Sequence, residues 1–115
     1  MNNTKKFYRV SNEITQQGLW YAFNGVFTGN IHKKFDFCKH RDLAMDFDEE
    51  LLGFISATPS LDELYSWFPK EDIIRLQEHG YYIHVFESNN HKFYERFQHQ
   101  VIDQKSAKLI QKIVL

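Results

Sequence analysis

One stretch of the chain, residues 51–69, most constrains the fold, because it predicts a strand that runs directly into a helix. The apolar run Leu52–Ile55 is typical of a buried strand. Three small residues follow, and Ser60 with Glu63 three positions later forms the capping-box pattern of a helix start. Pro69 ends this helix, since proline lacks an N–H and clashes with the preceding turn. The buried face of the helix is predicted from the i, i+3, i+4, i+7 spacing of Leu61, Leu64, Tyr65 and Phe68.

The junction between this strand and this helix has two interpretations. Ser56 and Thr58 carry hydroxyls to a helix N-terminus, an arrangement that suits anions and nucleotides. The alternative is a well-formed strand-to-helix turn that binds nothing. The stretch taken alone favours the second interpretation.

Length, charge and cysteine content limit the functional classes. The 115 residues predict a single domain, 1–115, and a hydrophobic content of 43% with 25% charged residues is typical of a soluble globular protein. The net charge of −1 predicts no nucleic acid partner, because no basic field is available for a phosphate backbone. The N-terminus lacks the apolar core of a secretion signal, and no run approaches the ~20 apolar residues of a membrane helix. We therefore expect a cytoplasmic protein with no membrane partner, and the bias toward Asn, Lys, Phe and Ile indicates a bacterial or phage genome rich in A and T.

The first strand is predicted over residues 6–10 and contains an arginine. Arg9 either finds a partner inside the fold, since a buried unpaired guanidinium is costly, or lies on an edge strand with its head in water. A short helical turn over 13–17 follows, with Ser11 or Asn12 as its cap and Gly18 as its C-terminal residue.

The remaining elements follow from local patterns. Residues 19–23 and 26–28 flank Asn24-Gly25, the strongest short signal for a β-hairpin. A second helix over 71–79 ends at Gly80, and a strand follows over 81–87. A turn over 88–90, a strand beginning within 98–102 and a loop over 103–106 complete the pattern, whereas residues 93–97 fit no element clearly. Residues 108–115 are compatible with either a strand or a helix.

No metal site is predicted. The acidic run 46–50 matches no cation-binding loop and is typical of a solvated helix start. The six histidines, at positions 32, 40, 79, 84, 91 and 99, show no metal-ligand spacing. Cys38 has no base or second cysteine near it in sequence and is expected to be a small core or surface residue.

The order of these segments resembles the ADP-ribosyltransferase fold, in particular its small bacterial toxin and antibiotic-modifying branches. Tyr8-Arg9-Val10 is similar to that family's opening strand, whose arginine braces the nucleotide site. Residues 53–61 resemble its strand ending in Ser-Thr-Ser with the Ser-Leu helix start, and residues 81–85 its Tyr-x-Tyr-x-Val strand. Residues 98–101 lie where the family has Glu-x-Glu-Val or Gln-x-Glu-Val, and residues 106–114 resemble its closing strands.

The resemblance implies an α+β fold with two small antiparallel sheets around a cleft that binds NAD, ADP-ribose or a related signalling nucleotide. It places Gln100 at the family's catalytic glutamate and Gln98 at the helper position, so no catalytic residue is assigned. The nearest carboxylates in sequence, Glu95 and Glu87, could replace the glutamate only in a different register of this region. A neutral amide keeps a hydrogen bond to the ribose but loses the negative charge that stabilises the leaving of nicotinamide. The ligand-binding residues implied are Arg9, Val10, Ser11, Ser56, Ala57, Thr58, Tyr65, Gln98 and Gln100.

Three functions are compatible with this pattern. The first is nucleotide binding without turnover, in a phage context a way to sequester an immune signal of the host. The second is an active ADP-ribosyltransferase or NAD glycohydrolase that acts on a host protein. The third is a protein-interaction module that contacts a host protein through aromatics such as Trp20, Tyr21 and Trp67, which otherwise belong to the core.

Overall fold

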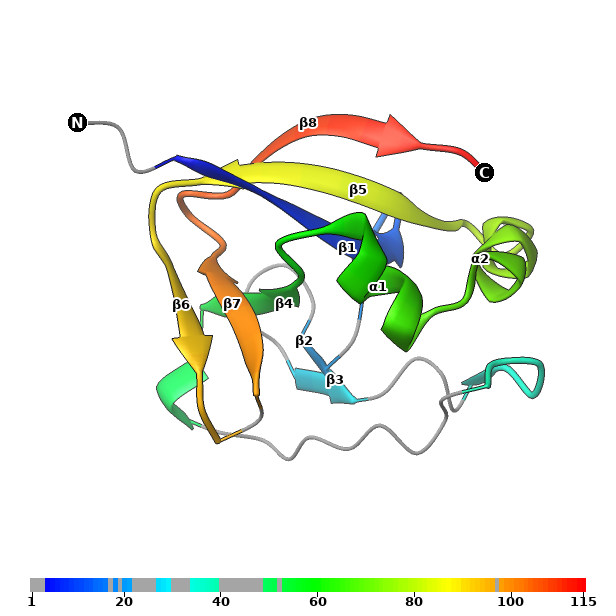
Figure 1. Cartoon of the computed structure of the whole chain (residues 1–115), viewed down its shortest axis with the longest axis horizontal. Helices are drawn as coiled ribbons and strands as arrows, with labels where there is room; N and C mark the ends of the chain where they lie inside the picture. Colours follow the sequence, from blue (N-terminus) through cyan, green and yellow to red (C-terminus); the bar gives the residue numbers. More distant parts are fainter. Residues whose placement is uncertain are drawn as a thin grey trace.

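The computed structural model describes residues 4–16, 18, 20–21, 27–29, 34–39, 49–51, 53–96 and 98–115. Its first sheet contains β1 (Lys5–Asn12), β5 (Tyr81–Ser88) and β8 (Lys108–Ile113), in the antiparallel order β1-β5-β8. β5 is rich in β-branched and aromatic residues and lies at the centre of this sheet, as such a sequence favours. Figure 1 shows the sheet along the top of the molecule, with the start of β1 and the end of the chain at opposite ends of the long axis.

A second antiparallel sheet lies below the first. It contains β4 (Phe54–Ala57), β7 (His99–Asp103) and β6 (His91–Tyr94), in the order β4-β7-β6. A separate two-stranded ladder joins β2 (Trp20–Tyr21) to β3 (Phe27–Gly29), which confirms antiparallel pairing of the two segments of the predicted hairpin, while its Asn24-Gly25 turn lies outside the described residues. The architecture therefore confirms the mixed α and β class with two small antiparallel sheets.

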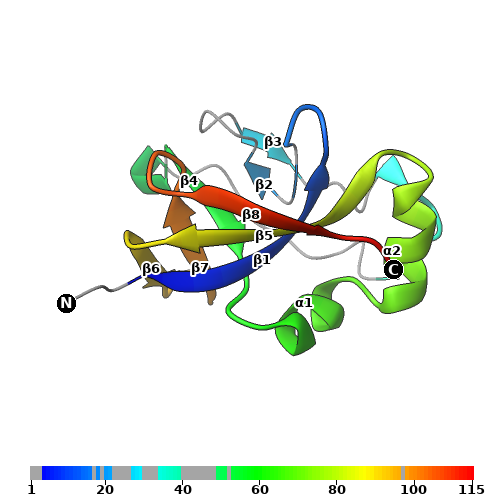
Figure 2. The same ribbon diagram turned by 90° about the horizontal axis from the view of Figure 1, so that it is seen from above.

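The two three-stranded sheets meet where β4 ends. Tyr8 of β1 and Thr58 exchange two backbone hydrogen bonds, with N···O distances of 2.8 and 2.9 Å. The chain then passes through Pro59, which has no N–H to continue the pairing, and enters α1 (Leu61–Trp67). Figure 2 shows α1 to one side of β1, and α2 (Lys70–Gln77) next to the start of β5.

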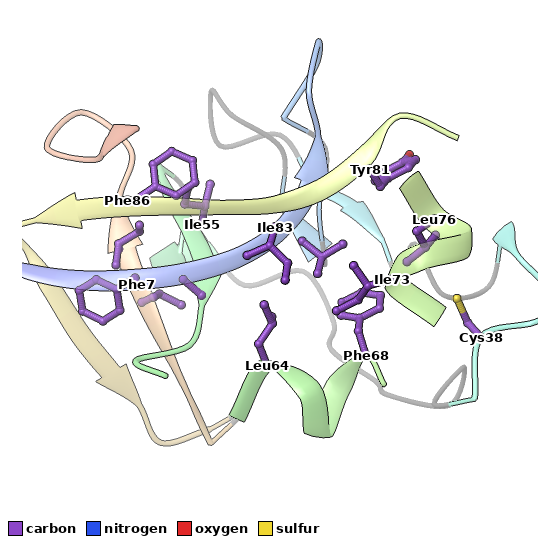
Figure 3. Packing of buried hydrophobic residues seen from close by; sticks show 14 of the residues in the cluster. Phe7, Cys38, Ile55, Leu64, Phe68, Ile73, Leu76, Tyr81, Ile83 and Phe86 are labelled. Atoms are coloured by element: carbon purple, nitrogen blue, oxygen red, sulfur yellow. The ribbon is translucent and has the colours of Figure 1, made fainter. Parts of the chain in front are cut away.

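The hydrophobic core fills the space between the sheets and the helices. Phe7, Ile55 and Phe86 pack between β1, β4 and β5, and Leu64 points from α1 toward Ile83 (Figure 3). Farther along, Ile73 and Leu76 of α2 complete the core together with Phe68. Burying large apolar side chains of this kind stabilises the fold by roughly 1.5–3 kcal/mol each, before the entropy cost of ordering the chain is subtracted.

The segment 34–39 packs against α2 and the start of β5. The ring of Phe35 lies 4.8 Å from that of His79 and 5.8 Å from that of Tyr81. The backbone N–H of Lys39 donates to the buried carboxylate of Asp72 at 3.0 Å. Cys38 is buried, as expected of a small core residue. The acidic run ends in the short 3-10 helix Glu49–Leu51, and its residues 46 and 48 lie outside the described part of the chain.

Three expectations about local structure need correction. β4 begins at Phe54 because Gly53 has a φ of +85°, which breaks the extended run predicted from Leu52, and β4 lies at the edge of its sheet. The turn after β1 is closed by Gln16, with a φ of +59°, whereas Gly18 bridges Ser11 of β1. Ser60 caps α1 through a 3.2 Å bond from the Glu63 N–H, but the reciprocal bond of a capping box does not form between them.

Other local predictions are confirmed or settled. The helices end before Pro69 and Gly80, and Gly80 has the positive φ expected at a helix C-terminus. Asn12 caps the following turn, since its Oδ1 accepts from Ile14 at 2.8 Å and Thr15 at 3.0 Å. The ambiguous C-terminal segment forms strand β8, and residues 93–94 belong to β6.

Candidate functional site

Arg9 is buried in the centre of the molecule, with 2% of its surface exposed. Its Nη1 donates to the carbonyl oxygen of Ser56 at 2.8 Å, and its Nη2 donates to the carbonyl oxygen of Gln16 at 3.2 Å. Burial lowers the pKa of Arg9 to about 9, so the guanidinium is still charged at neutral pH. Of the two possibilities predicted for this arginine, the structure confirms the one in which it is held inside the fold.

Gly18 forms one wall around the guanidinium. A Cβ atom at this position would lie 2.5 Å from Cζ and 2.6 Å from Nη2 of Arg9, which is closer than real contacts allow. The glycine is therefore needed for close approach to Arg9, and not for the left-handed turn that the sequence predicted.

Beside Arg9, a serine and a histidine from neighbouring strands form a second polar contact. The Ser56 Oγ and the His99 Nε2 are 3.1 Å apart, and both side chains are buried. The indole of Trp67 meets the His99 ring edge-on, with centroids 5.7 Å apart. The hollow between Arg9, Ser56, Trp67 and Phe68 has a volume of about 10 Å³, which is room for one water molecule.

Two residues beyond Arg9 on β1, Ser11 contacts His84 and Gln16. The Ser11 Oγ donates its only hydrogen to Gln16 Oε1 at 2.9 Å, so the 2.8 Å contact to His84 requires Nδ1 of His84 to donate. Burial lowers the pKa of His84, the positive charges of Lys112 and Arg9 lower it further, and Glu13 opposes them. A neutral His84 that donates to Ser11 cannot activate it as a nucleophile, and both side chains are buried.

Most of the residues implied by the resemblance lie inside the protein. Six are buried: Arg9, Val10, Ser11, Ser56, Ala57 and Thr58. Tyr65 is half-buried, and the Lys70 ammonium lies 5.0 Å from the centre of its ring. Gln98 is exposed in the turn before β7, where its Nε2 donates to the carbonyl oxygen of Glu95. Their roles as ligand contacts stay predictions.

The structure brings Arg9 and Ser56 together but places Gln100 elsewhere. Ser56 pairs with Val101 and Ala57 with Gln100 in the register between β4 and β7. Successive side chains of a strand point to opposite faces, and His99 is the residue that reaches Ser56. Sequence reasoning therefore missed His99. The one sequence signal for His99 was its position next to Gln100, because a one-residue change in the register of β7 exchanges the two faces of the strand.

Gln100 lines an open pocket of about 320 Å³ on the other face of the second sheet. The pocket forms where Pro59 leads the chain away from β1. It is lined by side chains from β1, β6, β7 and this turn: Lys5, Phe7, Pro59, His91, Phe93 and Gln100. Lys92 also contributes to the lining, but its ammonium lies 4.6 Å from the centre of the Phe54 ring.

Three side chains of this open pocket are available for a ligand. The Lys5 ammonium forms no ion pair with a described residue, and the Gln100 amide likewise has no hydrogen-bond partner among them. Phe93 is 49% exposed. The pocket thus combines a cation, an amide that can donate and accept, and an aromatic ring, whereas His91 is packed with its ring 5.0 Å from that of Phe7.

Across the part of the chain that is described, no three His, Cys, Asp or Glu side chains are grouped as metal ligands. Within the same residues, neither helix has the length and apolar character needed to cross a bilayer.

Comparison with known proteins gives one relationship. No curated protein and no solved structure matches the chain. A family model described as Bacteriophage T4 Y00F protein matches residues 1–115.

Proposed function

We propose that this chain, which belongs to the Bacteriophage T4 Y00F protein family, binds a phosphate-bearing nucleotide such as NAD or ADP-ribose. The proposed ligand occupies the open pocket beside Gln100. The observation that carries this proposal is that Lys5, Phe93 and Gln100 line one accessible pocket, where neither the Lys5 ammonium nor the Gln100 amide is paired with another of the described residues. In a phage protein, such binding fits the sequestration of a host signalling nucleotide.

Volume and chemistry both favour the open pocket over the hollow beside Arg9 as the ligand site. A volume of about 320 Å³ lies within the range of small-molecule sites, whereas about 10 Å³ beside Arg9 does not. The hydrogen bonds of Arg9 to Ser56 and Gln16 also give its guanidinium a structural task. A nucleotide in that hollow would have to displace Trp67 and Phe68, which line it.

The proposal includes binding and no bond-breaking step. Gln100 is a neutral amide, and loss of a well-placed electrostatic group in an active site typically costs on the order of 10² or more in rate. Nicotinamide release from NAD, abolished by Gln100→Ala and retained in Lys108→Met, would instead establish the enzyme hypothesis. Lys108 lies on β8, outside this pocket, which makes it a matched surface control.

The test is isothermal titration of the purified protein with NAD, ADP-ribose and cyclic ADP-ribose isomers. We expect heat of binding with at least one of them, and at least tenfold weaker binding for Phe93→Ala, because base–aromatic stacking contributes about 1–3 kcal/mol. Phe93 is exposed, so this change should leave the melting temperature nearly unchanged. Absence of heat with every ligand, from a folded sample, would exclude the proposed function.

A protein-interaction module is the second candidate, favoured by a separate group of exposed aliphatic residues. Ile14 is 86% and Val114 62% exposed. Glu13 donates its N–H to the Gly80 carbonyl and pairs with Lys112 at 3.2 Å, which places the Ile14 turn near the end of β8. Binding of a purified host protein that is lost in Ile14→Ser but kept in Phe93→Ala would support this candidate.

A further inference from the structure

We infer that the open pocket recognises the adenosine-phosphate half of its ligand, and not the nicotinamide half. This inference rests on the proposed function and adds which part of the nucleotide is bound. It follows from the register of β6 and β7, from the side chains of Lys5, Phe93 and Gln100 that line the pocket, and from the volume of the pocket.

Phe93 and Gln100 are direct partners across the β6–β7 ladder. Side chains of such a pair lie on the same face, with Cβ atoms about 4.5–5.5 Å apart. A planar base that stacks on the exposed Phe93 ring therefore has one edge within reach of the Gln100 amide. The pocket thus supplies a stacking surface and a hydrogen-bonding group in the geometry that a nucleobase requires.

The Gln100 amide is complementary to adenine. Its oxygen accepts and its NH₂ donates, and the Hoogsteen edge of adenine offers a donor at N6 beside an acceptor at N7. This bidentate pairing of glutamine with adenine recurs in nucleic-acid recognition. The nicotinamide ring of an oxidised dinucleotide carries a positive charge, which Lys5 at the same pocket would repel.

Lys5 supplies the counter-charge for a phosphate. It lies on the same face of β1 as Phe7, two residues away, and both line the pocket. Lys5 is exposed and forms no ion pair with a described residue, so its ammonium is available to an anion.

The size of the pocket also favours one nucleoside phosphate. Ligand pockets range from about 300 to 1,000 Å³, and this pocket of about 320 Å³ is at the lower end. A base, a ribose and a phosphate match such a volume, whereas the second ribose and base of a dinucleotide would project into solvent.

The test is a competition titration of the full chain with AMP, ADP-ribose, nicotinamide mononucleotide and ribose 5-phosphate. We expect AMP to displace ADP-ribose, and nicotinamide mononucleotide and ribose 5-phosphate to bind at least tenfold more weakly than AMP. Tighter binding of nicotinamide mononucleotide than of AMP would overturn the inference and leave the proposed function standing. Absence of binding by all four, with NAD also inert, would overturn both.

Two variants separate the base contact from the phosphate contact. Gln100→Leu should reduce the preference for AMP over UMP by about tenfold, because it removes the amide that forms hydrogen bonds with the edge of adenine. Lys5→Met should weaken both nucleotides equally and reduce the dependence of binding on salt. An unchanged AMP preference in Gln100→Leu overturns the role of Gln100. Phe93→Tyr should bind like the wild type, and Lys108→Met is the matched control for loss of a lysine outside the pocket.

Discussion

The Arg9 guanidinium donates through Nη1 to the Ser56 carbonyl oxygen at 2.8 Å, and so links β1 of the first sheet to β4 of the second across 47 residues of sequence. Near this link, the Tyr8–Thr58 backbone pair joins β1 to the residue that directly follows β4. Arg9 thus acts as a buried brace between the two sheets. The stability of a variant that lacks this arginine tests that structural role.

Replacing Arg9 with Met should destabilise the fold. Met fills part of the space but leaves the carbonyl oxygens of Ser56 and Gln16 without this donor, and each buried unsatisfied group costs about 1–3 kcal/mol. We expect the free energy of unfolding in urea to fall by about 2 kcal/mol or more. Equal or greater stability would contradict the role of Arg9 as a structural brace, since apolar replacement of buried charges can be stabilising.

Gly18→Ala should destabilise the protein through Arg9. The added methyl group would lie 2.5 Å from Cζ of a guanidinium that its hydrogen bonds hold in place. Overpacking of this kind typically costs about 1–3 kcal/mol. In a double-mutant cycle with Arg9→Met, the cost of Gly18→Ala should largely disappear, because the atoms it clashes with are gone. Strict additivity would show that Gly18 acts through its own backbone.

Stability should fall as the pH drops below about 6.5. The pKa of His84 is lowered in the folded protein by burial, so the unfolded chain, whose histidine has a pKa of about 6.5, binds a proton first. The contribution of His84 is complete above pH 6.5 and is lost between that pH and the lower pKa of the folded state. Urea unfolding from pH 7.5 to pH 5 measures the slope, and His84→Gln should flatten it. A steeper slope in the variant would contradict this assignment.

Ser60→Ala should weaken the start of α1. Ser60 Oγ accepts a hydrogen bond from the Glu63 N–H at 3.2 Å, and loss of an N-cap typically costs about 1 kcal/mol. Ser66→Ala is the matched control, because Ser66 is exposed inside the same helix and alanine favours helices. Chemical denaturation of the two variants should differ by about 1 kcal/mol. Equal stabilities would show that packing of Leu64 alone fixes this helix.

Local sequence signals predicted much of the fold. Pro69 and Gly80 mark real helix ends, and the residues of β5 are those of a buried strand. Positive φ at Gln16 was not predictable, because glutamine does not favour it and Gly18 lies two residues away as the expected choice. Glycine is instead needed at position 18 because a side chain there would clash with Arg9, a tertiary contact that no local pattern contains. The bacteriophage family description agrees with the composition-based expectation of a bacterial or phage genome.

The candidate site was only partly predictable. The resemblance implied Arg9 and Ser56 in one site, and the structure brings the two residues together through a hydrogen bond from the guanidinium to the Ser56 backbone carbonyl, while their role as ligand contacts stays a prediction. The sequence could not show whether His99 or Gln100 faces Ser56. The alternation of a strand says that the two side chains point to opposite faces, but not which face each one occupies. For Trp67 the sequence allowed two interpretations, a core residue or a contact residue for a partner. Its ring packs edge-on against His99, a contact that depends on the position of α1 relative to β7.

Strand β7 begins directly after a residue with a positive φ. Gln98 has a φ of +57°, and its side chain donates to the Glu95 carbonyl oxygen. Loss of a single residue from this turn, followed by a one-residue shift of β7 against its neighbours, would exchange the two faces of the strand. His99 would then face the open pocket, and Gln100 would face Ser56 beside Arg9. In evolution, the identity of the group offered to a ligand can therefore change through a length difference in a hairpin turn, without any substitution in the strand itself.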